Sequence, residues 1–310
     1  MKYIKLKSKD TYFNLACEEY VFSNLNDGDY LILWKSKNAV VIGKNQNPYA
    51  EIDMKAAEDF NVDIARRATG GGAVYQDEGN LNYSFIIQPE SDFDCMNYVT
   101  EALKKLGIKA VLSGRNDIEI EGKKISGTAQ RERNGKLMVH GTLLIDSDLD
   151  RLNLLLTPDE LKLKSKGIES VRSRVCNIRE YRAVTENEIV QVLTAGMDEY
   201  IVSESETVNI REISEKYASW EFIFGTSPEF EYVKKLQLNC GIVEFGAEIK
   251  QGRIVSCKFS GDYLGLKDAE EIADGLAGCR FTKEEIDRVL SHYDIWLYFD
   301  NTTKEDLTVI

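Results

Sequence analysis

The first ninety residues combine one helical stripe with a series of short apolar runs. After Asp10, a typical N-cap, apolar residues recur at helical spacing, which predicts an amphipathic helix over residues 11–25. The runs that follow are five or six residues long and are separated by turn residues, so they predict strands. They are YLILW at 30–34, AVVIG at 39–43, VDIAR at 62–66, GAVYQ at 72–76 and NYSFII at 82–87.

The middle of the chain mixes helices with hairpins. Residues 93–106 have a helical pattern, and Gly107 suits the position just after a helix end. The segment DIEIEGKKISG predicts one hairpin, and Asn134-Gly135 predicts a second, because Asn-Gly supplies the positive φ angles of a type I′ turn. Helical patterns return near 158–165 and 186–200. The regular strand-helix alternation of a Rossmann domain is missing, so we expect an α+β fold with a mixed, largely antiparallel sheet.

The last part of the chain predicts a small module of its own. Beyond the aromatic stretch SWEFIFG, the segments GIVEFGAEI and RIVSCKFS are strand-like, and two short helices follow. Thr282 and Glu285 have capping-box spacing at the start of the second helix. With Pro228 near the change of pattern, we expect a large domain over 1–227 and a small α+β domain over 228–310.

Composition narrows the class of protein. A formal net charge of −13 would repel a nucleic-acid backbone, so nucleic-acid binding is not expected. The six cysteines are scattered without a CxxC pair, which indicates free thiols. We find neither a signal peptide nor an apolar stretch near the roughly 20 residues of a membrane helix, and we therefore expect a cytoplasmic protein.

The stretch RRATGGGAVYQDEGN at 66–80 has the strongest chemical signal. Glycines let backbone N–H groups approach a ligand closely, and Arg66 or Arg67 can supply charge-assisted hydrogen bonds to an oxyanion. The alternative is a glycine-rich bulge with solvated arginines. The stretch lacks the Gly-Lys-Ser/Thr ending of a P-loop, and no helix follows it as in the dinucleotide fingerprint. We expect a ligand loop of another kind.

The stretch GRNDIEIEGKKISGTAQR at 114–131 is the second candidate. Lys123 and Lys124 are adjacent on a predicted strand, so they should face opposite sides, one inward and one solvated. The inward lysine could clamp a carboxylate and an α-phosphate, although an exposed hairpin charge is the alternative. Asp117 could help to hold Mg²⁺. His140, on an apolar strand, is more typical of a satisfied core residue than of a catalytic one. The cations of KGIESVRSRV at 166–175 either close over an anion or are surface charges.

Taken in order, these motifs, together with KNQNPYAEI at 44–52 and HGTLLI at 140–145, resemble lipoate–protein ligases over nearly the whole chain. The resemblance implies a fold of the biotin/lipoate ligase type, with flanking helices and a tunnel for an acyl chain. It implies that Lys124 is the catalytic residue, that Asp117 lies near the phosphate, and that 166–175 folds over an adenylate. The positions that would contact or border the acyl-adenylate are Arg67, Thr69, Gly71, Gly72, Val74, Tyr75, Gln76, Asp77, Asn80, Asp117, Arg131 and His140.

The implied reaction is activation of lipoate by Mg·ATP to lipoyl-AMP, followed by transfer to a lysine of an acceptor protein. The acceptor would be a glycine-cleavage H protein or a lipoyl domain of a 2-oxoacid dehydrogenase. Family members usually carry histidine at the position of Gln76, which here cannot titrate near neutrality. Rival interpretations are an octanoyl transferase, a biotin ligase and a non-catalytic lipoyl-binding paralogue. The segment 114–117 has no cysteine nucleophile, which disfavours the transferase.

Overall fold

The computed structural model describes residues 1–114, 116–156, 175–227 and 230–308. The chain divides into two compact units, Met1–Ile223 and Phe224–Ile310, a division four residues before the expected domain boundary. The predicted helix at 158–165 lies outside the described residues. In the ranges above, no helix is both long enough and apolar enough to cross a membrane.

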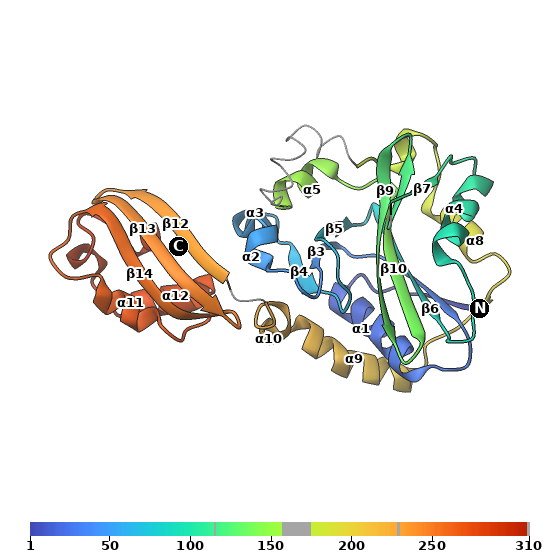
Figure 1. Ribbon diagram of the computed structural model, residues 1–310, viewed down its shortest axis with the longest axis horizontal. Helices are drawn as coiled ribbons and strands as arrows, with labels where there is room; N and C mark the ends of the chain where they lie inside the picture. The colour runs from blue at the N-terminus through green and yellow to red at the C-terminus, as the bar shows by residue number, and fades with distance from the viewer. Residues whose placement is uncertain (115, 157–174, 228–229, 309–310) are drawn as a thin grey trace. The chain divides into compact units, whose positions relative to one another are not determined.

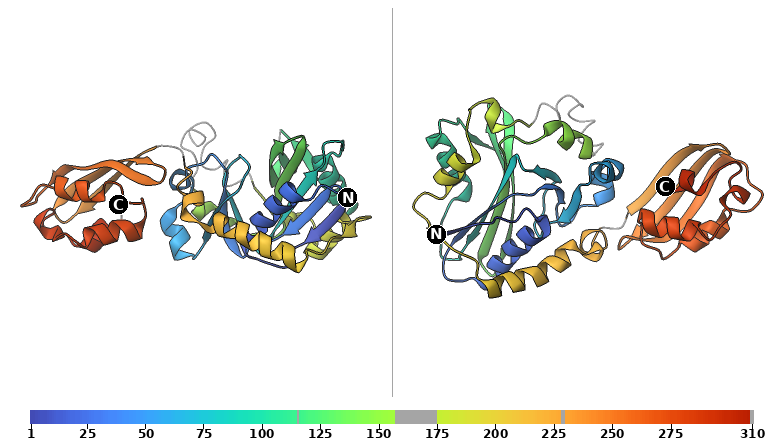
Figure 2. Two further views of the ribbon diagram at one scale, coloured as in Figure 1. Left: turned by 90° about the horizontal axis from the view of Figure 1, so that it is seen from below. Right: turned by 180° about the vertical axis from the view of Figure 1, so that it is seen from behind.

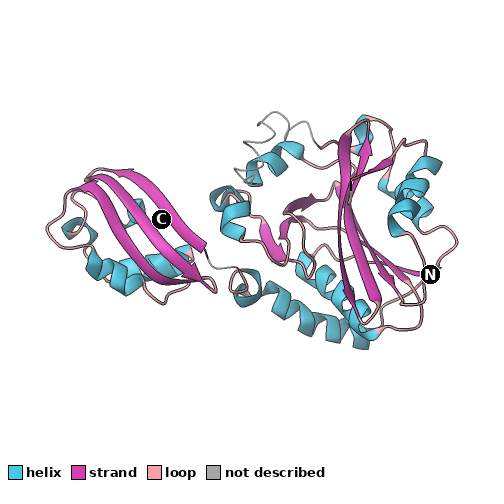
Figure 3. Ribbon diagram, viewed as in Figure 1, coloured by secondary structure: helices cyan, strands magenta, loops and turns pink. Residues whose placement is uncertain are grey.

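The larger unit contains an eight-stranded sheet in the order β11-β1-β2-β6-β10-β9-β8-β7 (Figures 1 and 3). The pairs of β1 with β2 and β11 are parallel, and the other neighbours are antiparallel. The predicted mixed, largely antiparallel sheet is therefore confirmed. The strands are β1 Lys2–Lys5, β2 Tyr30–Trp34, β6 Asn80–Ile87, β7 Val111–Ser113, β8 Asp117–Ile120, β9 Lys123–Arg133, β10 Lys136–Leu144 and β11 Asp198–Glu199.

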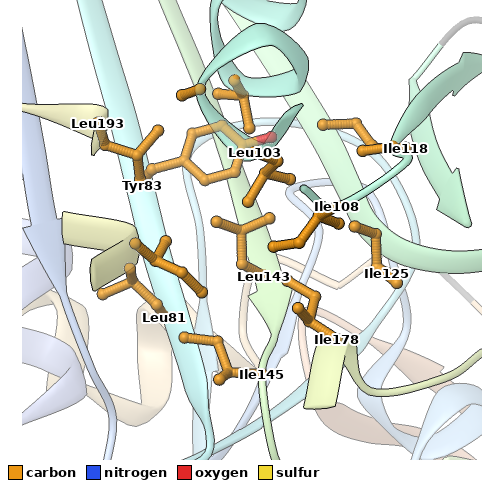
Figure 4. Close-up of a cluster of buried hydrophobic side chains, with 14 of the residues drawn as sticks. Leu81, Tyr83, Leu103, Ile108, Ile118, Ile125, Leu143, Ile145, Ile178 and Leu193 are labelled. Atoms are coloured by element: carbon orange, nitrogen blue, oxygen red, sulfur yellow. The ribbon is translucent and has the colours of Figure 1, made fainter. Parts of the chain in front are cut away.

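Strand alternation divides the core into two layers. On β2, Leu31 and Leu33 face a cluster with α4 (Cys95–Lys105) and α8 (Glu186–Leu193), part of which is drawn in Figure 4. Tyr30, Ile32 and Trp34 face the other cluster, with α1 (Thr11–Asn24) and α9 (Glu204–Ala218). These two helices lie side by side (Figures 1 and 2). Both faces of the central strands are thus buried, which explains why β2 is a continuous apolar run.

A second, three-stranded sheet in the order β4-β3-β5 carries the glycine stretch (Figure 3). Its strands are β3 Asn38–Ile42, β4 Asp63–Arg66 and β5 Val74–Asp77. The remaining short helices of the larger unit are α2 Pro48–Glu51, α3 Met54–Asp59, α5 Leu149–Leu155, the 3₁₀ helix η1 Ile178–Glu180 and α10 Trp220–Ile223. The glycine stretch joins β4 to β5, so the prediction that it lies between two strands is confirmed.

The residues predicted to start helix α1 and to form the turn between β9 and β10 do so in the structure. Asp10 accepts hydrogen bonds from the backbone N–H groups of Tyr12 and Phe13 and so caps α1. Asn134 and Gly135 have φ angles of 56° and 77°, as the predicted turn between β9 and β10 requires. The pattern at 186–200 is helical only as far as Leu193, because the chain turns at Gly196 (φ 78°) and then pairs as β11 with β1.

The smaller unit is an antiparallel sheet in the order β12-β13-β14 with short helices. The predicted strands at 241–249 and 253–260 are β13 and β14, and Thr282 caps α12 by accepting from the N–H of Glu285. Strand β12 was not predicted. The elements are β12 Phe230–Leu238, β13 Gly241–Lys250, β14 Arg253–Tyr263, α11 Glu270–Leu276, α12 Lys283–Leu290, the 3₁₀ helix η2 Ile295–Leu297 and α13 Lys304–Leu307.

Candidate active site

A pocket of about 110 Å³ opens in the larger unit, between the two sheets and the N-terminal helix. Its walls come from α1, β2, β3, the glycine stretch, β5, β6, β9 and β10. Seven of the predicted site residues line it: Arg67, Gly71, Gly72, Val74, Gln76, Lys124 and His140. Segments that are far apart in the sequence therefore meet at one cavity.

Arg67 organises the glycine stretch from inside. Its guanidinium donates to the carbonyl oxygens of Gly70 and Gly72 at 2.6 and 2.8 Å, and to that of Val41 on β3 at 3.1 Å. Gly71 has a φ of 89°, and a Cβ there would lie 2.8 Å from an Arg67 nitrogen. Burial lowers the pKa of Arg67 to about 10, so the side chain remains charged at neutral pH. It lines the pocket, and its guanidinium donates hydrogen bonds to main-chain carbonyl groups and to the Thr69 hydroxyl.

Arg66 has a similar structural role. It is 1% exposed and donates to the carbonyl oxygens of Lys44 and Gln46 at 2.9 and 2.8 Å. It also donates to the carbonyl of Ile223, the last residue of α10, at 2.9 Å. The expectation that Arg66 could bind an oxyanion is therefore wrong, because its guanidinium is enclosed by main-chain carbonyl groups.

A buried chain of hydrogen bonds connects the glycine stretch to α1. His140 Nε2 lies 2.6 Å from the Thr69 hydroxyl, and His140 Nδ1 lies 2.9 Å from a Glu18 carboxylate oxygen. Arg67 Nε donates to the same Thr69 hydroxyl at 3.1 Å. The imidazole serves both partners, with Nδ1–H donating to Glu18 and Nε2 sharing a hydrogen bond with the Thr69 hydroxyl. We call these four residues the Glu18–Arg67 chain.

The Glu18 carboxylate anchors this chain. Burial acts to raise the pKa of its carboxyl, but the charge of His140 and hydrogen bonds from His140, Ser84 and Trp34 outweigh burial and lower it. The Trp34 indole N–H donates to Glu18 at 2.7 Å, and the Ser84 hydroxyl donates to the same oxygen. His140 therefore has the satisfied buried position predicted for it, and it also lines the pocket.

Gln76 belongs to a neighbouring polar group. It is 4% exposed, and its side-chain oxygen accepts from the Ser36 hydroxyl at 2.8 Å and from Asn82 Nδ2 at 3.2 Å. A neutral histidine has a single acceptor nitrogen and could not accept both hydrogen bonds at one atom. The side-chain oxygen of Gln76 thus suits a network with two donors.

Lys124 provides the cationic end of the pocket. Its ammonium lies 2.7 Å from a carboxylate oxygen of Asp117, on the adjacent strand β8. The backbone of Gly127 leaves room for it, since a Cβ there would lie 2.8 Å from Lys124 Nζ. Lys123 is not among the lining residues, and its main-chain carbonyl accepts from the Cys176 thiol. Of the two adjacent lysines, Lys124 therefore is the one that lines the pocket.

The described chain resumes at Val175, beside Lys124. Leu156 bridges to Ile52, and Val175 forms a parallel bridge to Lys124, whose carbonyl also accepts from the N–H of Cys176 at 3.0 Å. Of the predicted run at 166–175, only Val175 belongs to the described residues, and the other nine lie outside them. The described residues thus end at Leu156 and begin again at Val175, next to Lys124.

Other predicted residues lie around the pocket rather than on its wall. Tyr75 packs in a separate apolar cluster, and its hydroxyl donates to Asn38. Asp77 accepts from the N–H groups of Gly79 and Asp148, so it closes a turn. Asn80 donates to Asn82 at 3.1 Å.

Arg131 lies against α1. It pairs with Glu19 and stacks on the Phe22 ring at 4.3 Å. The structure thus brings neither Arg131 nor the Asp77–Asn80 turn onto the wall.

Sequence reasoning missed Glu18 and Trp34. Both belong to elements interpreted as core, and Glu18 lies three residues after Leu15 and four before Phe22 on the buried side of α1. A carboxylate inside an apolar helical stripe was the available signal, since buried charges are rare unless they are paired.

Comparison with known proteins identifies the family. Residues 10–198 match the family model of the lipoyl protein ligase A/B catalytic domain, and residues 227–310 match the bacterial lipoate protein ligase C-terminus. The chain belongs to the lipoate–protein ligase family. Lipoate-protein ligase LplJ of Bacillus subtilis is 39% identical over 96% of this chain and 95% of its own length. Lipoate–protein ligase 1 of Staphylococcus aureus is 35% identical over 99% of this chain and 98% of its own length.

Solved structures of lipoate–protein ligases share the fold. A bipartite lipoate protein ligase from Thermoplasma acidophilum, described with its E2 lipoyl domain, has a TM-score of 0.66 and 30% identity over 73% of this chain and 96% of that one. A lipoate-protein ligase A bound with ATP has a TM-score of 0.64 and 28% identity over 73% of this chain and 98% of that one. The biotin/lipoate ligase type of fold is therefore confirmed.

The pocket differs from the thioester-forming transferase site considered above. No cysteine lines it in the described ranges. Cys95 and Cys176 are the cysteines nearest in sequence to the 114–117 segment, and burial raises the pKa of Cys95 to about 12 and raises that of Cys176. Such thiols are poor nucleophiles at neutral pH. This ligase-family chain thus has a lysine, and no activated thiol, at its described pocket.

The Glu18–Arg67 chain predicts a pH-dependent effect on stability. Glu18→Gln should lower the free energy of unfolding by about 2 kcal/mol at pH 7, because the charge-assisted acceptor is lost. The pKa of Glu18 is lower in the folded state than its ordinary value of 4.5. Ionised Glu18 therefore stabilises the fold fully above pH 4.5, and this stabilisation is lost as the pH falls through the folded-state pKa. The difference from wild type should therefore shrink toward pH 3 in denaturant unfolding.

Glu19→Gln is the matched control, because Glu19 is the adjacent carboxylate and is paired near the surface with Arg131. We expect it to cost less than about 1 kcal/mol. Equal losses for the two variants would contradict the anchoring role of Glu18.

Proposed function

We propose that this chain activates lipoate with Mg·ATP to lipoyl-AMP and then transfers the lipoyl group to a lysine of an acceptor protein. The observation that carries the proposal is the position of Lys124, a charged residue at the edge of a partly apolar pocket within a ligase catalytic domain. Relatives solved with lipoic acid and with ATP support the two substrates.

The pocket suits an amphipathic acid. Leu15, Trp34, Val41 and Val74 supply apolar wall for an acyl chain, and the glycines at 71 and 72 leave space along it. We assign the carboxylate end of lipoate to Lys124, where an ammonium can bind both the carboxylate and an α-phosphate oxygen. The Glu18–Arg67 chain then joins the glycine stretch to His140 and α1 through hydrogen bonds.

The first step requires charge stabilisation and alignment. A lipoate carboxylate oxygen attacks the α-phosphorus, a new O–P bond forms, and the bond from that phosphorus to the bridging oxygen breaks, which releases pyrophosphate. Lys124 neutralises the negative charge that gathers on the α-phosphate, and its contact with Asp117 sets the position of its ammonium. No side chain has to become covalently attached.

Magnesium enters as part of the nucleotide substrate. Among the described residues, no group of three or more His, Cys, Asp or Glu side chains could hold a metal ion. Mg²⁺ usually keeps several waters and binds one or two carboxylates together with phosphate oxygens. Asp117 fits as such a single ligand, and its carboxylate would then be shared between the ion and Lys124.

The second step transfers the acyl group. The neutral amine of an acceptor lysine attacks the acyl carbon, a C–N bond forms, and the C–O bond to AMP breaks as the amine loses a proton. We propose a lipoyl domain of a 2-oxoacid dehydrogenase or a glycine-cleavage H protein as the acceptor. The relative described with an E2 lipoyl domain supports the first of these.

We also propose a division of labour between the two domains and a place in the cell. Residues 1–227 would form the catalytic domain that binds lipoate and ATP, and 228–310 a small accessory domain. The two family models support this division, since the catalytic-domain model matches residues 10–198 and the C-terminus model matches residues 227–310. The use of ATP and of metabolic acceptor proteins fits the cytoplasm.

The proposed reaction is tested by product release. The purified chain with lipoate and Mg·ATP should release pyrophosphate, and release should stop when either substrate is left out. Biotin in place of lipoate should give none. Acyl transfer from an octanoyl carrier thioester without ATP would instead favour the transferase, and lipoyl-AMP binding without turnover would favour the non-catalytic paralogue.

The role of Lys124 is tested against its neighbour. Lys124→Ala should reduce lipoyl-AMP formation by about 10²–10³-fold, since a charged group aimed at the developing oxyanion is removed. Lys123→Ala should retain activity within a few-fold of wild type. The measurement is pyrophosphate release under saturating lipoate and ATP, and equal losses in the two variants would contradict the assignment.

A further inference from the structure

The side-chain nitrogen of Gln76 faces the pocket assigned to lipoate. Gln76 lines that pocket and is 4% exposed. Within the described ranges, its Nε2 donates no hydrogen bond to the protein, and this atom is not one of the fully enclosed polar atoms. Its N–H groups therefore meet the cavity. The two proposed reaction steps leave this donor without a role.

The neighbours of Gln76 determine which end of its amide faces the pocket. The Ser36 hydroxyl accepts from Thr11 at 2.9 Å and donates to Gln76 Oε1 at 2.8 Å. Asn82 Oδ1 accepts from Asn80 Nδ2 at 3.1 Å, and Asn82 Nδ2 donates to Gln76 Oε1 at 3.2 Å. Because both neighbours donate, the oxygen of Gln76 turns toward them and the nitrogen is left for the cavity.

This donor lies well away from the cationic end of the pocket. Lys124 belongs to β9, and its ammonium lies beside Gly127 of the same strand, where a Cβ would be 2.8 Å away. Gln76 contacts Asn82 of β6. The strand order β6-β10-β9 separates these two strands by two spacings, which is about 10 Å. A ligand held by its carboxylate at Lys124 would thus reach Gln76 with its other end.

The pocket residues near this donor are apolar or negatively charged. Trp34 pairs with Asn82 across β2 and β6, and Val74 belongs to the same strand as Gln76; both line the pocket. Glu18, which accepts from the Trp34 indole N–H at 2.7 Å, lines it as well. The Glu18 carboxylate would repel a carboxylate or a phosphate placed here. This end of the pocket therefore suits a neutral, mostly apolar group that can accept a hydrogen bond.

Lipoate carries such a group, because its carboxylate and its sulfur-bearing ring are at opposite ends of a methylene chain. We propose that the Gln76 amide donates to a ring sulfur of lipoate and so selects lipoate over an all-carbon acid of the same shape, an inference that rests on the proposed function. Sulfur is a weak acceptor, but a methylene group in its place would cover the N–H without any hydrogen bond. Burial of an unpaired donor lowers the affinity for the all-carbon acid.

The test compares lipoate with 5-cyclopentylpentanoate, in which methylene groups replace both ring sulfurs. For each acid, kcat/KM is measured by pyrophosphate release at saturating Mg·ATP, and the KM for ATP is measured with lipoate. Gln76→Met removes the donor and keeps an unbranched side chain. Ser36→Ala is the matched control, because it removes one hydrogen bond to Gln76 and leaves the donor in place. Gln76→Glu keeps an acceptor oxygen for Ser36 and Asn82, and it decides the question if Gln76→Met does not fold.

We expect wild type to prefer lipoate by about tenfold in kcat/KM, and Gln76→Met to lower this preference to about twofold, mainly because the all-carbon acid improves. Gln76→Glu should lower it too, since an oxygen then faces the sulfur. Ser36→Ala should keep the wild-type preference, and the KM for ATP should not change in any variant.

Three results would overturn the proposal: a wild type without preference, an unchanged preference in the Gln76 variants, or an equal loss in Ser36→Ala. A raised KM for ATP in the Gln76 variants would overturn it as well, and would assign the donor to the nucleotide. A wild-type chain that releases no pyrophosphate with lipoate would instead count against the proposed function.

Discussion

The architecture of the pocket depends on the buried Glu18–Arg67 chain. It joins α1, strand β10 and the glycine stretch, which are separated by more than fifty residues in the sequence, through Glu18, His140 and Thr69. Each polar atom in such a chain has a partner, so the desolvation cost of burying an arginine and a glutamate is offset by charge-assisted hydrogen bonds. The carbonyl groups of the glycine stretch then converge on Arg67, which fixes the shape of one wall.

The position of the Lys124 ammonium depends on strands β8 and β9. Strands β8 and β9 place Asp117 beside it, and the missing side chain at Gly127 leaves the space that its ammonium occupies. The glycine stretch is thus fixed by internal hydrogen bonds, while the Lys124 ammonium is paired with the Asp117 carboxylate. This asymmetry suits a reaction in which the enzyme contributes electrostatics and alignment rather than a covalent intermediate.

Sequence patterns predicted β2 to β6 and β8 to β10, because buried strands and turn residues have strong local signals, but not the short strands β1, β7 and β11. The hairpin at Asn134-Gly135 and the helix after Asp10 follow from one or two residues each. The separation of β3, β4 and β5 into their own sheet was not predictable, since it depends on pairing between distant segments. For the candidate site, the sequence indicated which segments matter but not the partner of each charge.

The two arginines illustrate that limit. A guanidinium beside glycines suggests an anion, yet Arg66 is enclosed by carbonyls of the loop at 43–46 and of α10, and Arg67 by those of its own loop. Residue type gives the sign of the charge and the number of donors, whereas the partner is decided by the tertiary fold. The role of Glu18 was not predicted for the same reason, because its partners come from β2, β6 and β10.

The central claim is that this pocket makes and holds lipoyl-AMP. The most direct measurement is the amount of lipoyl-AMP that remains with the wild-type chain after incubation with lipoate and Mg·ATP and rapid gel filtration, determined by mass spectrometry of the released small molecule. The account predicts about one lipoyl-AMP per chain, which disappears on addition of a lipoyl-acceptor protein as the acceptor gains a lipoyl group. A chain that retains no adenylate, or an acyl group found on a cysteine of the enzyme, would contradict it.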